Sequence, residues 1–388
     1  MHVQKHFILF SVGLLLFTAC KKENSSSSNQ DNGCVTQQAL NNGDFIEGQY
    51  IVAYQSSATN RLSSESRLYE LNSSVLQRNS ISTDVVQQSF IGAMSGFVAK
   101  LTEQEAQRLK QDNSIATIEQ DRVIGLSTCF TVVEPRLITW NIAQVGYGDG
   151  TGKTAWIIDS GIDFTHPDLN VDATRSRSFI SGQTSAADDN GHGTHVAGII
   201  GAKNNTIGVL GVASGATLIA LKVLDKDGKG VLSDVIRALS YVSSNAKAGD
   251  VVNMSFGEEE PSNILDQQVQ AIAAQGILFA IAAGNESKPA SQFSPGRVNA
   301  PNVFTVSAVD SLGNFASFSN YGNDAVDVAA PGVRILSTYM QGKYARASGT
   351  SMAAPHVAGL LLLNGRNIKS SGVAGNDPDG TPDPIAHK

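Results

Sequence analysis

Residues Gly349-Thr-Ser351-Met-Ala-Ala-Pro355-His-Val-Ala-Gly359 place a serine at the start of an apolar segment with a glycine at each end. The run of small and apolar residues predicts a buried helix that begins beside Ser351. Taken alone, such a serine is most simply a helix-capping residue. The same position would set the Ser351 hydroxyl beside the free N–H groups of a helix N-terminus, which favours developing negative charge.

Two upstream segments carry the partners that a nucleophilic serine needs. Asp159 directly follows the apolar residues Ala155-Trp-Ile-Ile, and His192 lies between glycines in Asn190-Gly-His-Gly-Thr-His195 at the start of an apolar helix. A serine hydroxyl is protonated at neutral pH, so attack requires an imidazole to take the proton and a carboxylate to hold that imidazole. Singly, the aspartate would be a turn residue and the histidine a helix-start residue. Together they favour acyl transfer.

Other chemistries find less support in the chain. His192 and His195 lack the acid of an HExxH zinc site, and no CxxC or Cys/His cluster has zinc spacing. There is no GxSxG, which counts against an α/β-hydrolase, and no GxxxxGK[ST] loop for nucleotides. The net charge of −7 does not favour a nucleic-acid-binding protein, which typically carries an excess of basic residues.

The second half of the chain alternates apolar strands with helical stretches, which predicts an α/β fold with a parallel sheet covered by helices on both faces. Sites on such sheets lie at the carboxyl ends of strands and the amino ends of helices, where the three motifs fall. The expected strands are Thr154–Ile158, Thr217–Val223, Val251–Met254, Ile277–Ala282, Val303–Val309 and Val326–Ala329.

The N-terminus has the pattern of an exported protein. Phe7–Phe17 is an apolar run that is too short to span a bilayer as a helix, which favours a signal peptide at 1–19. Small residues before Cys20 and a polar stretch after it resemble the lipobox of bacterial lipoproteins, in which the cysteine is acylated. An ordinary signal peptide with an incidental cysteine is the alternative. Residues 20–43 are rich in Ser, Asn, Gln and Gly and predict a flexible tether.

Residues 44–126 predict a small α+β domain of the order β-α-β-β-α-β, which is ferredoxin-like. Its second helix is expected to start at a capping box formed by Thr102 and Glu105. A large domain at 127–370 and a polar C-terminal tail at 371–388 complete the predicted organisation.

The Asp, His and Ser segments, in that order, resemble the three motifs of the subtilases, the subtilisin-like serine proteases. Further stretches resemble the proteinase K branch of that family: Ala220-Leu-Lys-Val-Leu-Asp-Lys-Asp-Gly228, Val252-Asn-Met-Ser-Phe-Gly257 and Ala316-Ser-Phe-Ser-Asn-Tyr-Gly322. The resemblance covers about residues 139 to 365 and implies a subtilisin-like fold and a serine endopeptidase.

The resemblance also implies a role for each matching position. It makes Ser351 the nucleophile, His192 the general base and acid, and Asp159 the orienting carboxylate. Asn285, in Ala282-Ala-Gly-Asn-Glu, matches the asparagine of the oxyanion hole. Two segments match the strands that flank an extended peptide substrate, with a broad preference leaning to apolar or aromatic residues before the cut. They comprise Lys229, Gly230, Val231 and Leu232, and Ser255, Phe256 and Gly257.

Family members are often zymogens, so residues 44–126 are expected to be an inhibitor-like propeptide that assists folding and then blocks the cleft. The cut is expected between Gly125 and Arg136, with Leu126 as a candidate for the residue before it. A cut there would separate the protease from a lipid on Cys20, unless a disulfide between Cys34 and Cys129 keeps it tethered. Unpaired cysteines are equally compatible with the sequence.

The remaining expectations concern ligands, partners and location. The family resemblance implies that the chemistry requires no cofactor and that calcium stabilises loops. Asp188-Asp189-Asn190 and Asn376-Asp-Pro-Asp-Gly380 offer suitable oxygens, although no ligand set follows from the sequence. Protein or peptide substrates, a monomeric enzyme and an exported location, in the envelope or outside the cell, are expected. A catalytically silent binding protein and an esterase with the same machinery are the alternatives.

Overall fold

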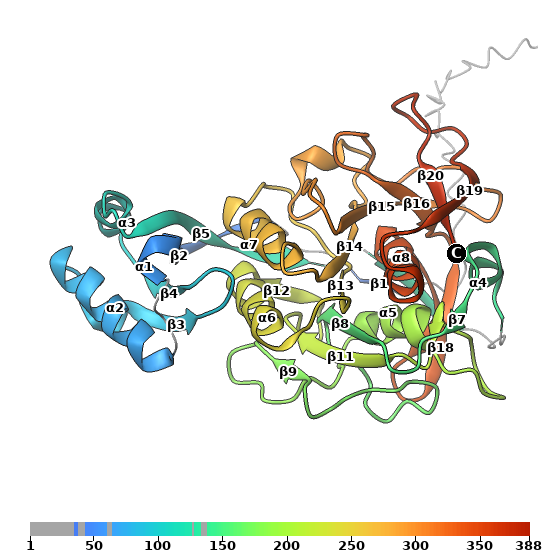
Figure 1. Ribbon diagram of the computed structural model, residues 1–388, viewed down its shortest axis with the longest axis horizontal. Coiled ribbons are helices and arrows are strands. Elements are labelled where there is room, and N and C mark those ends of the chain that lie inside the picture. Colours follow the sequence, from blue (N-terminus) through green and yellow to red (C-terminus); the bar gives the residue numbers. More distant parts are fainter. Residues whose placement is uncertain (1–34, 38–42, 60–63, 126–127, 133–137) are drawn as a thin grey trace, which may run out of the picture. The chain divides into compact units, whose positions relative to one another are not determined.

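The computed structural model describes residues 35–37, 43–59, 64–125, 128–132 and 138–388 (Figure 1). The expected signal peptide at 1–19, the candidate lipidation site Cys20, most of the 20–43 tether, Cys34 and Leu126 lie outside the described residues. Within the described ranges, no helix combines the length and the apolar character needed to cross a membrane.

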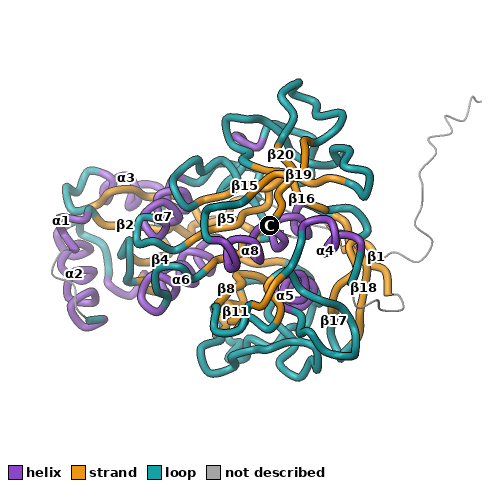
Figure 2. Tube along the Cα trace, turned by 45° about the vertical axis from the view of Figure 1, so that its right-hand side comes forward, coloured by secondary structure: helices purple, strands orange, loops and turns teal. Residues whose placement is uncertain are grey.

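The large C-terminal region is built on a nine-stranded sheet, and the six strands expected from the sequence all belong to it. The strand order is β19-β20-β16-β15-β14-β13-β8-β11-β9, and each neighbouring pair except β19 and β20 is parallel (Figures 1 and 2). The strands are β8 (Thr154–Asp159), β9 (Arg177–Ser178), β11 (Thr217–Lys222), β13 (Val251–Met254), β14 (Leu278–Ala282), β15 (Val303–Val309), β16 (Val328–Pro331), β19 (Lys369–Val373) and β20 (Pro384–His387).

Helices cover both faces of this sheet, as the near-continuous apolar strands predict. Along β8, Ala155 and Ile157 join one core with α5 and α8, whereas Trp156 and Ile158 join a second core with α6 and α7. This alternation follows from the two-residue period of a strand. The helices of this region are α4 (Trp140–Val145), α5 (His192–Gly201), α6 (Leu232–Asn245), α7 (Asn263–Ala273), α8 (Thr350–Asn364) and the 3-10 turn η2 (Ala290–Gln292).

The C-terminal residues differ from the expected polar tail at 371–388. Strand β20 pairs in parallel with β16, through Ala329 and Ile385, and β19 continues the sheet at its edge. Ile385 and Ala386 are buried. Only a few apolar residues are needed to fill the edge of a sheet, and so short a run among polar residues gives little periodic signal.

The N-terminal region has the predicted β-α-β-β-α-β order, with antiparallel strands in the sheet order β5-β2-β4-β3. The expected capping box is present: Thr102 accepts from the Glu105 N–H, and the Glu105 carboxylate accepts from the Thr102 N–H. The elements are β2 (Phe45–Tyr54), α1 (Ser56–Thr59), α2 (Glu65–Arg78), η1 (Thr83–Val85), β3 (Val86–Phe90), β4 (Gly96–Lys100), α3 (Glu103–Lys110) and β5 (Ile115–Gly125).

A strand of the large region extends the N-terminal sheet. Strand β12 (Lys229–Val231) pairs antiparallel with β5, so that Gly125, Ile124 and Val123 lie opposite Lys229, Gly230 and Val231. The N-terminal region therefore lies along an edge strand of the large region. Two smaller sheets complete the fold, formed by β1 (Val35–Gln37), β6 (Thr128–Val132), β18 (Lys343–Ser348) and β17 (Ile335–Tyr339), and by β7 (Gly148–Asp149) and β10 (Ala213–Ser214).

Candidate active site

Asp159 and His192 form a buried pair. The Nδ1 atom of His192 lies 2.9 Å from both carboxylate oxygens of Asp159, and both side chains are fully buried. Asp159 also accepts the Ser160 N–H at 2.7 Å. Because an ionised carboxylate only accepts hydrogen bonds, the proton of the neutral imidazole sits on Nδ1, which leaves Nε2 as the proton-accepting atom.

The loop before α5 holds His192 through a partly buried aspartate, Asp188. The Asp188 carboxylate accepts from the N–H groups of Asn190 and Gly191 and from both the N–H and the hydroxyl of Thr194. Burial raises the pKa of Asp188, and these donors act in the opposite direction. Gly193 allows close approach of this loop to the end of β8, since a Cβ there would lie 2.1 Å from the Gly161 carbonyl oxygen.

Ser351 lies in the first turn of α8 and is 3% exposed. Its hydroxyl donates to the backbone carbonyl of Ser255 at 2.8 Å, and the Ser255 hydroxyl donates to the backbone carbonyl of Ser351 at 2.8 Å. Asn253, on β13, donates its side-chain amide to the Ser255 hydroxyl at 2.8 Å. The start of α8 is thereby fixed to the end of β13.

The sheet register brings the three motifs to one edge. Ile158 lies opposite Met254 in the parallel pair β8–β13, so the next residues, Asp159 at the end of β8 and Ser255 just after β13, lie side by side. Helices α5 and α8 pack against each other. Asp159 is hydrogen-bonded to His192 and Ser255 to Ser351, so residues from three distant parts of the sequence meet at this edge.

Asn285 follows β14 at the same edge. Its side-chain carbonyl oxygen accepts the Thr350 N–H at 2.8 Å and the Thr350 hydroxyl at 3.0 Å. The Thr350 hydroxyl in turn accepts the Gly284 N–H at 3.1 Å. Since the oxygen of the amide is held by Thr350, its NH₂ end is the one available to a ligand. Thr350 is a positioning residue that the sequence analysis did not single out, although it lies beside Ser351 in the serine motif.

The two expected substrate segments differ in their contacts. Lys229, Gly230 and Val231 pair with β5, whereas Leu232 begins α6 and its side chain is buried with that of Ile124. In the other segment, Ser255 contacts Ser351, Phe256 is buried in the core, and Gly257 is partly exposed.

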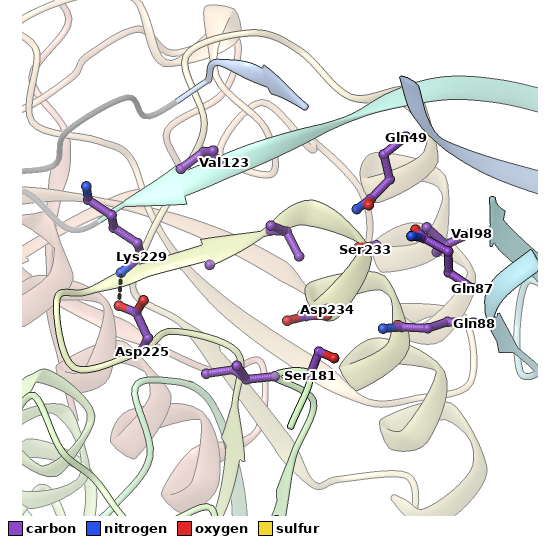
Figure 3. Close-up of a pocket in the computed structure, with 13 residues that line it drawn as sticks. Gln49, Gln87, Gln88, Val98, Val123, Ser181, Asp225, Lys229, Ser233 and Asp234 are labelled. Atoms are coloured by element: carbon purple, nitrogen blue, oxygen red, sulfur yellow. Dashed lines mark hydrogen bonds between the residues drawn. The ribbon is translucent and has the colours of Figure 1, made fainter. Parts of the chain in front are cut away.

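A cavity of about 530 Å³ lies beside the β5–β12 pair (Figure 3). Its lining comes from both regions of the chain and includes Gln49 and Val123 on one side and Asp225 and Asp234 on the other. The Lys229 N–H donates to Asp225 at 3.0 Å, which shapes the turn before β12. Asp159, His192 and Ser351 do not line this cavity, so it is separate from the site built around them.

Several of the carboxylates in the two segments that offer oxygens suited to calcium are engaged in protein contacts. The Asp188 carboxylate holds the loop before α5, and Asp189 pairs with the buried Lys222 at 2.6 Å. The Asp379 carboxylate accepts from Thr381 and Asn323. His195 faces the carbonyl oxygens of Ile335 and Ala345, and burial lowers its pKa to about 3. Among the described residues, no group of three or more His, Cys, Asp or Glu side chains is placed to hold a metal ion.

Comparison with known proteins agrees with this architecture. Residues 150–369 match the model of the subtilase family, described as Peptidase S8, and residues 49–127 match that of the peptidase inhibitor I9 family. A thermostable alkaline protease of Halalkalibacterium halodurans is 39% identical over 272 residues, which cover 68% of this chain and 71% of that protein. Subtilisin NAT of Bacillus subtilis subsp. natto is 42% identical over 275 residues, covering 68% of this chain and 69% of the relative.

A solved structure has the same fold. The crystal structure of a cold adapted subtilisin-like serine proteinase superposes with a TM-score of 0.58 at 32% sequence identity. The match covers 65% of this chain and 98% of the other chain. The chain therefore belongs to the subtilase family of serine endopeptidases and carries its own I9-type inhibitor segment as a propeptide, which makes it a zymogen.

Proposed function

We propose that peptide bonds are cleaved by Ser351 as nucleophile, His192 as general base and then general acid, and Asp159 as the carboxylate that orients His192. The observation that carries this assignment is the buried pair of Asp159 with Nδ1 of His192, at the sheet edge where Ser351 is bonded to Ser255. Held in this way, the imidazole presents Nε2 as the base for the serine proton.

The reaction has two halves. Nε2 of His192 takes the Ser351 proton as Oγ attacks the substrate carbonyl carbon, and the resulting tetrahedral intermediate carries negative charge on the former carbonyl oxygen. His192 returns the proton to the leaving amine as the C–N bond breaks, which leaves an acyl-enzyme. Water, deprotonated by the same imidazole, then releases the acid product and restores Ser351.

We assign Asn285 to the oxyanion hole. The Thr350 contacts fix its amide oxygen, which leaves its NH₂ group to meet the negatively charged oxygen together with the Ser351 backbone N–H. Both donors are then in place before charge develops, and such preorganised donors stabilise the transition state more than the ground state.

The substrate is proposed to lie as an extended strand between Lys229–Leu232 and Ser255–Gly257. The pairing of β5 with β12 supports the first contact, because the propeptide uses that edge in an antiparallel arrangement. Main-chain hydrogen bonds of this kind bind a peptide largely independently of its sequence. The proposed preference is accordingly broad, with apolar or aromatic residues favoured before the scissile bond.

The propeptide is proposed to act as an intramolecular inhibitor until it is cut between Gly125 and Arg136, for instance after Leu126. Its β5 strand already occupies the β12 edge and contacts α7: the Glu119 carboxylate accepts from the Ser262 hydroxyl at 2.5 Å and from the Ile264 N–H at 2.9 Å. These contacts would delay release after cleavage.

We further propose export as a lipoprotein acylated at Cys20, with Cys34 and Cys129 joined by a disulfide that keeps the cut enzyme tethered. The lipobox-like sequence supports the first proposal, and the placement of the two cysteines on either side of the cut supports the second. Mass spectrometry of the secreted and membrane fractions identifies the N-terminus left by the signal peptide and the N-terminus left by the propeptide cut. Two fragments that separate on a gel without reductant would refute the tether.

We also propose a branch of the family, an oligomeric state and a ligand requirement for this protein. Resemblance at residues 220–228, 252–257 and 316–322 supports placement in the proteinase K branch. A monomer is proposed, with no cofactor required for the chemistry. Calcium is proposed as a structural ion only, and dialysis against EDTA followed by thermal unfolding tests it.

The experiment for the central proposal compares the purified protein with Ser351→Ala in a casein assay. We expect the variant to remain uncut at the propeptide junction and to lose casein cleavage. Ser244→Ala is the matched control, because the Ser244 hydroxyl bonds within its own helix, to the Ser240 carbonyl. Equal cleavage by the Ser351→Ala variant would exclude Ser351 from the mechanism.

A further inference from the structure

Arg122 of the propeptide is buried in a pocket of the protease region. Its side chain is 9% exposed although it lies near the end of the β5 strand. The Nη1 atom donates to the backbone carbonyl of Glu260 at 2.6 Å and lies 3.3 Å from that of Pro261. Both acceptors belong to the segment between β13 and α7. A cation from one region is therefore held by oxygen atoms of the other.

The carboxylate of Glu258 lies beside the guanidinium in this pocket. Glu258 has a fully buried side chain, and its Oε1 atom lies 3.7 Å from Nη1 of Arg122. Among the described residues, neither carboxylate oxygen of Glu258 has a hydrogen-bond partner. A buried carboxylate without donors is strongly disfavoured unless a cation lies beside it. Glu258 is thus suited to receive a positively charged side chain.

The oxygen atoms around the Arg122 guanidinium all belong to the protease region, although Phe45 of the propeptide also lies against this guanidinium, 5.0 Å from it to the ring centre. The Glu258 N–H donates to the Ser294 carbonyl at 2.9 Å, and the Ser262 N–H donates to the Ser294 hydroxyl at 2.9 Å. These two bonds hold the segment that carries Glu258, Glu260 and Pro261 from within the protease region, in addition to the contacts that Glu119 of the propeptide makes with Ser262 and Ile264. The acceptors would therefore remain in place for another ligand after the propeptide has left.

The register of β5 on β12 shows which substrate residue would reach this pocket. Val123 lies opposite Val231 in the β5–β12 pair, and Arg122 is the residue that precedes it. A substrate paired with β12 in the same direction would bring its own side chain at that position to Glu258.

We propose that Glu258 and the carbonyls of Glu260 and Pro261 form a subsite for an arginine side chain of the substrate, at the residue that precedes the one opposite Val231. This inference rests on the proposed function of β12 as a substrate-binding strand. A guanidinium fits because it stays ionised and is more weakly hydrated than an ammonium, and because the Nη1 atom of Arg122 faces all three acceptors. Before maturation the propeptide fills the subsite with Arg122.

The charges around Glu258 set the pH dependence of this preference. Burial raises the pKa of Glu258 to about 8, and Arg122 acts in the opposite direction. Glu119 and Asp121 on β5 and Asp266 on α7 also face it and raise the pKa, while Asp266 is itself paired with Arg297. The ionised carboxylate and the guanidinium stabilise each other, so the preference for arginine should grow as Glu258 loses its proton.

Two matched peptides test the subsite on the matured enzyme. Both reproduce residues 117–132 with Cys129→Ser, and one carries citrulline, a neutral isostere, in place of Arg122. We expect kcat/KM to be at least about 10-fold higher for the arginine peptide, as for a hydrogen bond to a charged group. The ratio should increase from about pH 6 to about pH 9 as the carboxylate ionises.

Two variants separate the subsite from a structural effect. Glu258→Gln should reduce the preference to about 2-fold or less, while Glu259→Gln should keep it. Glu259 is the matched control because it is the neighbouring carboxylate, is exposed and pairs with Lys288 instead. A Glu258→Gln variant that is less stable yet keeps the full preference would show a structural role and overturn the proposal.

The remaining outcomes are also decisive. Equal kcat/KM for the two peptides with the unmodified enzyme overturns the subsite, and this comparison stands even if Glu258→Gln does not fold. Cleavage of casein without cleavage of either peptide overturns it as well. If neither casein nor the peptides are cut, the proposed catalytic function fails, and the subsite fails with it.

Discussion

Ser351 and Ser255 exchange a reciprocal pair of hydrogen bonds. Each hydroxyl donates to the backbone carbonyl of the other residue at 2.8 Å. The bonds fix the first turn of α8 to the end of β13, next to the strand that carries Asp159. In this zymogen the Ser351 hydroxyl proton points to the Ser255 carbonyl, so its transfer to His192 requires the hydroxyl to turn away from that carbonyl. Rotation of a hydroxyl group is rapid compared with turnover.

Ser255→Ala should weaken the placement of the nucleophile without removing any reacting atom. The variant loses the bond to the Ser351 carbonyl and leaves Asn253 without that acceptor. We expect a loss of about 1 kcal/mol in the free energy of unfolding, as for one buried hydrogen bond, and a several-fold lower kcat. Urea unfolding and steady-state kinetics measure the two effects, with Ser244→Ala as control. An unchanged kcat would show that this bond has no positioning role.

Asn285→Ala should lower kcat by about 10²–10³-fold with little change in KM, which is the usual effect of losing one hydrogen-bond donor of an oxyanion hole. Thr350→Val should give a smaller loss, since it removes only the hydroxyl that helps to hold the Asn285 amide. The double variant should be no worse than Asn285→Ala, because both changes act on the same amide. Additive losses in kcat would contradict this coupling.

Asp159→Asn should lower kcat by about 10⁴-fold, because an amide NH₂ beside His192 favours the imidazole with its proton on Nε2. Such a tautomer cannot accept the Ser351 proton. The change keeps the shape of the side chain, so the variant should still fold, which circular dichroism checks. Near-normal kcat would show that Asp159 does not determine the tautomer.

The stability of the zymogen should fall as the pH rises through about 8. Burial beside the propeptide raises the pKa of Glu258 to about 8, whereas an exposed glutamate has a pKa of about 4.3. A raised pKa in the folded state means that the stabilisation is complete below about pH 4.3 and is lost as the pH passes through about 8. Thermal unfolding of the uncut Ser351→Ala protein at about pH 6 and about pH 9 measures this loss.

A second substitution identifies the group responsible. Adding Glu258→Gln to the Ser351→Ala protein should reduce the fall in melting temperature between the two pH values. Adding Arg122→Gln should enlarge it, because the cation that favours the ionised carboxylate is removed. The same fall in all three proteins would assign the effect to other groups.

Much of the fold follows from local patterns. The apolar strands around Ile157 and Ala280 predict the parallel sheet, and the Thr102–Glu105 capping box predicts the start of α3; both are confirmed. The edge strand β20 is missed because Ile385 and Ala386 lie among polar residues. Their burial depends on β16, which is distant in the sequence.

By itself, the sequence determined which residue types are available for chemistry and the order in which Asp159, His192 and Ser351 occur. These are local properties, expressed in short motifs at strand and helix ends. Only the tertiary structure decided that Thr350 fixes the Asn285 amide and that Arg122 is buried beside Glu258. Such contacts depend on the register of paired strands and on packing between distant segments, and no local periodicity of the chain encodes either.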